Sequence, residues 1–140
     1  MIHSQMEKVV ASVPTAVGSS AVTLTIDSLG YDYASVTVMR ASNASTVFAS
    51  VLKVEESDDN STFSNVTGMV GGTDFTIPAV SDTASAAIVK LDVDTKARKR
   101  YLKVTATPAV SVNTVVSARL SRGDAPTTAS EAGVIGWVKG

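Results

Sequence analysis

The chain of 140 residues is long enough for one domain with a buried core, and its net charge of −1 excludes a general attraction to nucleic acid or to an anionic membrane. It contains no cysteine, which excludes disulfide bonds and thiolate metal sites. No apolar run approaches the roughly 20 residues that span a bilayer, and the first residues lack a signal-peptide pattern, so we expect a soluble protein made in a cytoplasm.

Side-chain chemistry favours β-sheet over helix. The chain has 22 valines and 16 threonines but only 6 leucines. Valine and threonine are stiff at the first side-chain torsion and pack well on a pleated surface. Aromatic residues make up only 5% of the chain, so small side chains must fill the core. The composition predicts an all-β domain.

The first half of the chain contains three predicted strands. Residues 1–19 are interrupted by Pro14 and Gly18, and we interpret them as an N-terminal arm or edge strand that a partner orders. Apolar and polar residues then alternate over 20–27 and over 34–40, as in strands with one buried face. A longer strand is predicted over 47–56, followed by a polar turn.

The second half contains further short strands separated by turn signals. They are predicted at 75–77, at 86–93, and at 100–107 and 113–121, which form a hairpin around Pro108. Seven to eight short antiparallel strands argue for a β-sandwich or jelly roll. We expect an N-terminal arm over 1–19, the sandwich over 20–122, and over 123–140 a C-terminal tail that contains the chain's only tryptophan, Trp137.

An acidic cluster follows the long predicted strand and consists of Glu55, Glu56, Asp58 and Asp59. Several carboxylates in one flexible loop are the ligand type that Ca²⁺ prefers. The EF-hand spacing is absent, with no glycine at the required turn and no distal glutamate. A solvated turn that keeps a hairpin soluble is therefore the favoured interpretation, with a calcium site as the alternative.

Catalytic arrangements are weakly represented. Glu55 or Glu56 could pair with Asp92 or Asp94 for glycoside hydrolysis, but such pairs need aromatic cleft walls that this composition does not supply. The only histidine, His3, has no cysteine and no convincing serine–aspartate set around it. The glycines match no nucleotide-binding spacing. We expect neither an enzyme nor a cofactor, and no small-molecule substrate.

A basic run contains Lys96, Arg98, Lys99 and Arg100. Such a run can contact phosphates, but Tyr101 is the only aromatic beside it. We favour a charged turn before a strand over a nucleic-acid site, and an acidic protein surface would also serve as a partner.

Three stretches together resemble the head decoration, or cement, proteins of tailed bacteriophages. The first runs from Leu29-Gly30-Tyr31-Asp32 into 34–38, the second covers 52–66, and the third joins Lys99-Arg100-Tyr101-Leu102-Lys103-Val104 with 115–118 and the closing Arg122-Gly123-Asp124-Ala125-Pro126. The resemblance covers about residues 20–126. Asn60 stands where a glycine is expected in the turn, and residues 127–140 have no counterpart in the family.

This resemblance implies a non-enzymatic virion protein, made in a bacterial host, that lies on the outer capsid surface. Members of the family have a β-sandwich or jelly-roll fold and are often homotrimers that bridge neighbouring subunits of the major capsid protein. Binding only the assembled shell would stabilise it by mass action. Two alternatives stay open: another particle component, such as a tail or spike subunit, and a carbohydrate-binding β-sandwich.

The candidate capsid-binding residues come from our own interpretation of the two termini and the basic run. They are Met6, Val9, Val10, Lys96, Arg98, Lys99 and Trp137. The apolar terminal residues can become ordered on a partner, and the cations can set the register through charge pairs.

Overall fold

The computed structural model describes residues 6–17, 20–123 and 126–138, and it confirms the predicted all-β sandwich. The strands are β1 (Lys8–Ala11), β2 (Thr15–Val17), β3 (Val22–Asp27), β4 (Tyr33–Arg40), β5 (Val51–Ser57), β6 (Ser64–Val70), β7 (Ala87–Asp94), β8 (Tyr101–Thr107) and β9 (Val112–Ser121). The short 3-10 helix η2 (Thr95–Ala97) lies between β7 and β8. No helix in these three ranges has the length and apolar composition needed to cross a bilayer.

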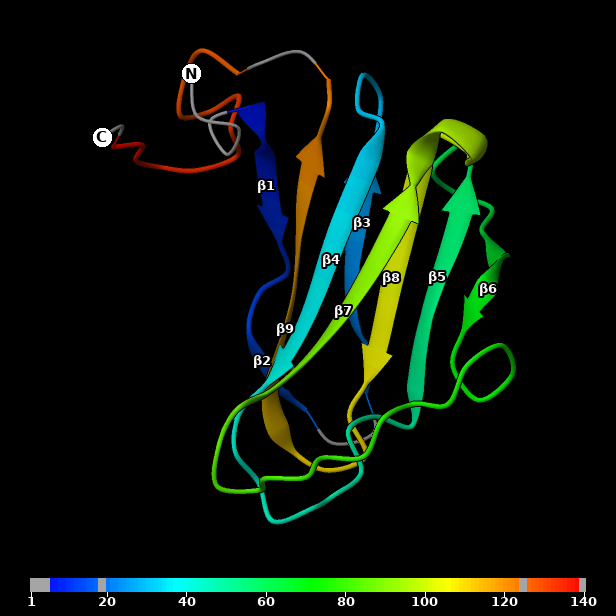
Figure 1. The fold of residues 1–140 in the computed structure, drawn as a ribbon, viewed down its shortest axis with the longest axis vertical. Coiled ribbons are helices and arrows are strands. Elements are labelled where there is room, and N and C mark those ends of the chain that lie inside the picture. Colours follow the sequence, from blue (N-terminus) through cyan, green and yellow to red (C-terminus); the bar gives the residue numbers. More distant parts are fainter. Residues whose placement is uncertain (1–5, 18–19, 124–125, 139–140) are drawn as a thin grey trace.

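The strands form two antiparallel sheets that face each other (Figure 1). Sheet A has the order β1-β9-β4-β7, with β2 also paired to β9, and sheet B has the order β3-β8-β5-β6. Because β1 and β2 both pair with β9, they act as one interrupted strand. Counted in this way, eight strands lie in the orders 1-8-3-6 and 2-7-4-5, which is a jelly-roll arrangement.

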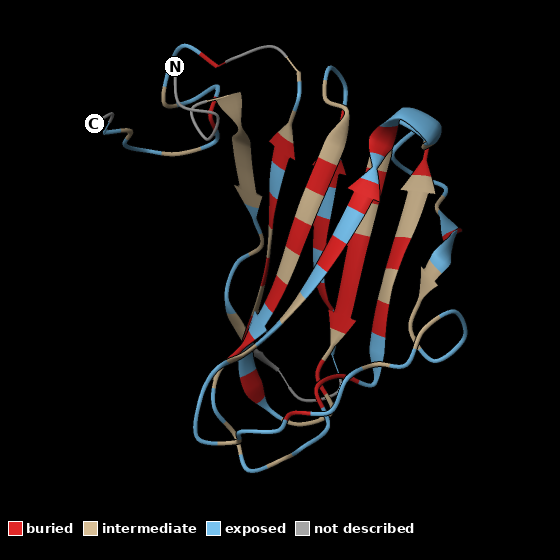
Figure 2. Cartoon of the chain, in the orientation of Figure 1, coloured by how far each residue is buried: buried red, intermediate tan, exposed pale blue. Residues whose placement is uncertain are grey.

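The core lies between the sheets and is built from the alternation seen in the sequence (Figure 2). Val22, Leu24 and Ile26 of β3 point inward, as predicted, while the threonines between them are exposed. Val36 and Val38 of β4 are likewise fully buried. Side chains of successive strand residues point to opposite faces, so each strand contributes every second residue to the core.

The predicted hairpin of 100–107 with 113–121 is wrong. Strand β8 pairs with β3 and β5 in sheet B, whereas β9 pairs with β4 and β1 in sheet A. The Pro108 segment therefore crosses from one sheet to the other. Alternation identifies the buried face of a strand but does not say which sheet the strand joins.

Two predicted strand segments have a different structure. Residues 75–77 form no strand, and Phe75 makes only an isolated bridge with Gly71. The predicted 47–56 strand begins at Val51, because Val47 is held by an isolated bridge to Ala79 instead. Phe75 and Ile77 still pack against the core. Their apolar side chains therefore indicated burial and not pairing within a strand.

The loop after β4 is held by Arg40, a fully buried charged side chain. Its Nη1 donates to the carbonyl oxygen of Val47 at 2.6 Å. Its Nη2 donates to the carbonyl oxygens of Ser45 at 2.7 Å and Asn43 at 3.3 Å. A single guanidinium thereby satisfies three carbonyls of a segment that has little secondary structure of its own.

The described residues before β1 and the C-terminal segment up to residue 138 lie at the same corner of the sandwich (Figure 1). Within the predicted arm, β1 and β2 form an edge of sheet A and pair with β9. This segment is therefore paired within its own chain. The C-terminal segment then lies along β1, where the Val9 backbone N–H donates to the carbonyl oxygen of Ala132 at 2.7 Å. His3 lies outside the described residues.

Candidate functional site

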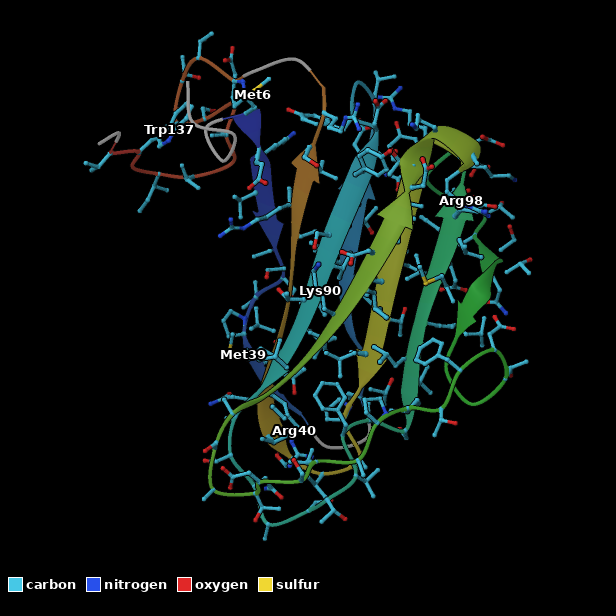
Figure 3. The ribbon with its side chains drawn as sticks, in the orientation of Figure 1. Met6, Met39, Arg40, Lys90, Arg98 and Trp137 are labelled. Atoms are coloured by element: carbon cyan, nitrogen blue, oxygen red, sulfur yellow. The ribbon has the colours of Figure 1, made fainter. Side chains whose placement is uncertain are left out.

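The predicted binding residues fall into two groups at the same end of the molecule. Figure 3 shows Met6 and Trp137 at the corner where the chain ends meet, while Arg98 lies across the end, beside η2. Val9 borders a groove with Trp137, but Val10 packs against the core. The structure thus brings Met6, Val9 and Trp137 together and separates them from the three cations.

A shallow groove of about 390 Å³ separates the C-terminal segment from β1 and β9. Its lining residues are Glu7, Val9, Arg119, Ala132, Val134, Gly136, Trp137 and Val138. The side chain of Val138 and that of the neighbouring residue Ile135 are fully exposed. We call Val9, Val134, Ile135, Trp137 and Val138 the terminal patch. It combines aliphatic side chains in water with a half-buried indole.

The terminal patch is positioned by a tight turn over residues 127–133. The Glu131 carboxylate accepts hydrogen bonds from the backbone N–H groups of Thr127 and Thr128, and this lowers the pKa of Glu131. Gly133 follows with φ +77° and lies so close to β1 that an added Cβ would be 1.8 Å from the Val9 carbonyl oxygen. Only glycine fits this close approach with that backbone conformation.

One wall of the groove carries an ion pair. The Arg119 Nη1 of β9 lies 3.3 Å from the Glu7 Oε2, which joins the residue before β1 to the neighbouring strand. The guanidinium side chain is largely exposed, whereas the carboxylate side chain is mostly covered. The groove therefore offers opposite charges next to the Trp137 ring.

The predicted cations contact groups of their own chain. Lys96 Nζ donates to the Tyr33 hydroxyl at 3.3 Å, and this bond raises the pKa of Lys96. Arg98 Nη1 lies 3.9 Å from Glu56 Oε1, and Lys99 Nζ lies 3.3 Å from Asp58 Oδ2. The basic run therefore meets the acidic cluster, and its charge is largely balanced within the molecule. Its role in partner binding stays a prediction.

The acidic cluster has protein partners throughout. Glu55 accepts from Lys53 at 3.0 Å and lies 3.1 Å from Lys103 Nζ. Burial acts to raise the pKa of Glu55, but these bonds outweigh it and the pKa is lowered. Asp59 accepts from the backbone N–H groups of Thr62 and Ser61 and from the Ser57 hydroxyl, which lowers its pKa strongly. These contacts are those of a well-capped turn.

A second surface, which the sequence analysis missed, covers the outer face of sheet A. Met39 on β4 lies opposite Ile88 on β7 and Val115 on β9, so three apolar side chains form a row across the sheet. Met39 and Ile88 are exposed. Both residues interrupt a face that is otherwise polar, with Ser35, Thr37 and Lys90 farther along the strands. The sequence could have indicated this surface, because Met39 and Ile88 are apolar residues at positions that alternate with buried ones.

Comparisons with known proteins give no family. The chain matches no family model and no curated protein. Among solved structures, a CBM32 domain from a family 31 glycoside hydrolase of Clostridium perfringens has 11% identity and a TM-score of 0.41, over 81% of this chain and 76% of that one. BuGH86 in complex with neoagarooctaose has 12% identity and a TM-score of 0.41 over 81% of this chain, which spans 19% of that protein's length.

A third similar solved structure is a pilus and not part of a glycoside hydrolase. Bacillus endospore appendages, described as disulfide-linked pili, have 11% identity and a TM-score of 0.34, over 82% of this chain and 89% of that one. All of these similarities concern the β-sandwich alone.

Proposed function

We propose that this chain is a non-enzymatic structural protein that binds the outer surface of a bacteriophage capsid and bridges neighbouring major capsid subunits. The terminal patch is the observation that carries the proposal. Ile135 and Val138 are large aliphatic side chains in full contact with water, on either side of Trp137 in the chain. Figure 3 shows Trp137 at the same corner as Met6. The resemblance of residues 20–126 to decoration proteins is our reason for proposing a capsid as the partner.

The chemistry of the patch favours a protein partner. Exposed aliphatic groups gain free energy when an apolar surface covers them, at about 25 cal/mol per Å². A protein shell offers such surfaces, whereas a sugar offers mainly hydroxyl groups. The patch is also fixed in place by Gly133 and by the Val9–Ala132 hydrogen bond, so little conformational freedom is lost on docking.

The test is co-sedimentation of the purified protein with heads assembled from the major capsid protein of the same genome. We expect wild type to pellet with the heads. The double variant Ile135→Ser/Val138→Ser should bind at least about tenfold more weakly, since each change removes buried apolar area at the contact. Val47→Ser is the matched control, because Val47 is also exposed but lies in the loop after β4.

Two outcomes would overturn this proposal. The first is wild-type protein that stays in the supernatant with assembled heads. The second is equal binding by wild type and the double variant, which would remove the terminal patch from the contact.

Carbohydrate binding is the second candidate function, and the groove beside Trp137 favours it. An indole with the Glu7–Arg119 pair nearby combines a stacking surface with hydrogen-bonding groups. A glycan array with wild type and Trp137→Ala tests this candidate. Carbohydrate binding predicts that wild type binds at least one glycan on the array and that the variant does not.

A further inference from the structure

Strand β7 forms one edge of sheet A and has features of a pairing edge. It is eight residues long, and within the described ranges it pairs with β4 alone. Its register with β4 is continuous from Tyr33–Asp94 to Arg40–Ala87, so no bulge twists the edge away. Such an edge presents a row of backbone donors and acceptors that a further strand can bond.

The hydrogen bonds of β4 show which β7 residues point toward the edge. The Thr95 N–H donates to the Asp32 carbonyl oxygen at 2.9 Å, one register step beyond the Tyr33–Asp94 pair. Hydrogen-bonded pairs recur at every second residue of an antiparallel ladder. Odd-numbered residues of β7 therefore bond β4, and the backbone groups of Ile88, Lys90, Asp92 and Asp94 point outward.

The other edges are blunted. The Val9 N–H at the β1 edge is already bonded to Ala132. Strand β6 has a register shift in its pairing with β5, between Lys53 and Glu55. Strand β3 is shorter than β7, with six residues from Val22 to Asp27. The β7 edge is the one that remains straight and long.

We propose that β7 pairs antiparallel with β7 of a second copy of this chain, in a two-fold register centred on Leu91. In this register Lys90 lies opposite Asp92 of the second copy, and Asp92 lies opposite its Lys90. Lys90 and Asp92 are both positions whose backbone N–H and carbonyl groups point outward from the edge, so each pair can form backbone hydrogen bonds. The two copies of sheet A then form one continuous sheet through an interface that uses the same surface of each.

Charge complementarity selects this register. Opposite charges on directly opposed residues stabilise a strand pair, and like charges destabilise it. Centring the pair on Lys90 or on Asp92 would place two identical charges face to face. The Lys90 and Asp92 side chains are both largely exposed and pair with each other within one chain, Nζ to Oδ2 at 2.9 Å, so the proposed register gives each of them a second, opposite charge.

The inner face of β7 supports the same arrangement. Val89, Leu91 and Val93 point toward the core, and the Leu91-centred register sets Val89 opposite Val93 of the second copy. Apolar side chains thus meet apolar side chains across the junction. On the outer face, the same register sets Ile88 opposite Asp94 of the second copy, so the row of Met39, Ile88 and Val115 ends at this edge. Figure 3 shows Met39 and Lys90 on the strands that lead to it.

The first measurement is the mass in solution by sedimentation equilibrium over a wide concentration range. We expect reversible association to twice the 14.4 kDa of one chain. Lys90→Asp and Asp92→Lys should each weaken self-association by about tenfold or more, because each places like charges opposite one another. The double variant Lys90→Asp/Asp92→Lys restores both opposite-charge pairs and should associate like wild type.

Mixing the two single variants is the sharpest test. A chain with two acidic residues at these positions and a chain with two basic residues match each other in the proposed register. We expect the mixture to form a heterodimer at concentrations where each variant alone stays largely monomeric, and this result cannot come from misfolding. A wild-type monomer at all concentrations, a mass of three chains, or no association in the mixture would overturn the pairing. The outcome is independent of capsid binding.

Discussion

Arg100 and Asp27 form a two-point ion pair across the end of sheet B. Arg100 Nε donates to Asp27 Oδ1 at 2.9 Å, and Nη2 donates to Oδ2 at 2.8 Å. The pair joins the last residue of β3 to the residue before β8. The hydrogen bonds from Arg100 are the main cause of the lowered pKa of Asp27.

Asp27→Asn should lower the free energy of unfolding near neutral pH by up to about 1 kcal/mol, since this half-exposed pair is screened by water. The folded-state pKa lies below the ordinary 3.8, so the stabilisation is present above that value and is lost as the pH falls through the folded pKa. Urea unfolding at about pH 7 and about pH 3 measures both effects. Equal losses of stability on acidification in wild type and variant would contradict this assignment.

Asn60 occupies the left-handed region with φ 57° in the acidic turn. Asn60→Gly should change the free energy of unfolding by less than about 0.5 kcal/mol, because glycine adopts this conformation readily. Asn60→Val should cost about 1–2 kcal/mol, because a β-branched residue is strained there. Asn65→Val, at an exposed position of β6, is the control and should be nearly neutral. Chemical denaturation of the three variants would contradict the prediction if both valine variants behaved alike.

Arg40→Met should destabilise the protein by about 3 kcal/mol, since three carbonyl oxygens in the loop after β4 lose the charged donor supplied by the buried Arg40 side chain. Arg40→Lys retains the cation but not the fork geometry, so an intermediate loss is expected. Thermal unfolding checks the order of the variants. Arg119→Met removes an exposed arginine and should change stability by less than about 0.5 kcal/mol. The prediction would be contradicted if the Arg40→Met protein were as stable as the Arg119→Met control.

Gly133→Ala should detach the C-terminal segment from β1, because the new Cβ would collide with the Val9 carbonyl oxygen. Hydrogen exchange at the Val9 amide should then become faster, while exchange within β4 and β8 stays slow. Gly136→Ala is a matched control in the same segment, since an added Cβ there meets no atom within 4 Å. Unchanged protection of Val9 in the Gly133 variant would show that the contact is not rigid.

The sequence was sufficient to predict the strands that have one buried face. Residues 22–27 and 33–38 alternate, because every second side chain enters the core, whereas Met39 and Arg40 reverse the pattern with an exposed apolar and a buried charged side chain. The sequence could not assign β8 and β9 to different sheets, since the Pro108 segment is compatible with either a hairpin or a crossover. Topology depends on long-range packing that a local pattern does not contain.

The same limit applies to the candidate sites. The acidic and basic runs were analysed separately, although the β5–β8 register places Glu56 and Ser57 opposite Leu102 and Tyr101 and so brings the two runs together. The role of β7 as an edge also depends on strand order. By contrast, the tryptophan and the apolar residues near the termini were recognisable from composition, because such residues are unusual in a polar tail.

Pairing of β1 with β9 has a consequence for synthesis. Lys8 lies opposite Leu120, so β1 emerges from the ribosome well before the strand with which it pairs. At about 5–20 residues per second this delay is of the order of ten seconds, during which the β1 segment has no partner in its own sheet. The terminal patch is assembled later still, when Ala132 reaches Val9. Nascent or prematurely terminated chains therefore lack the patch, and only chains translated through the C-terminal segment can present it.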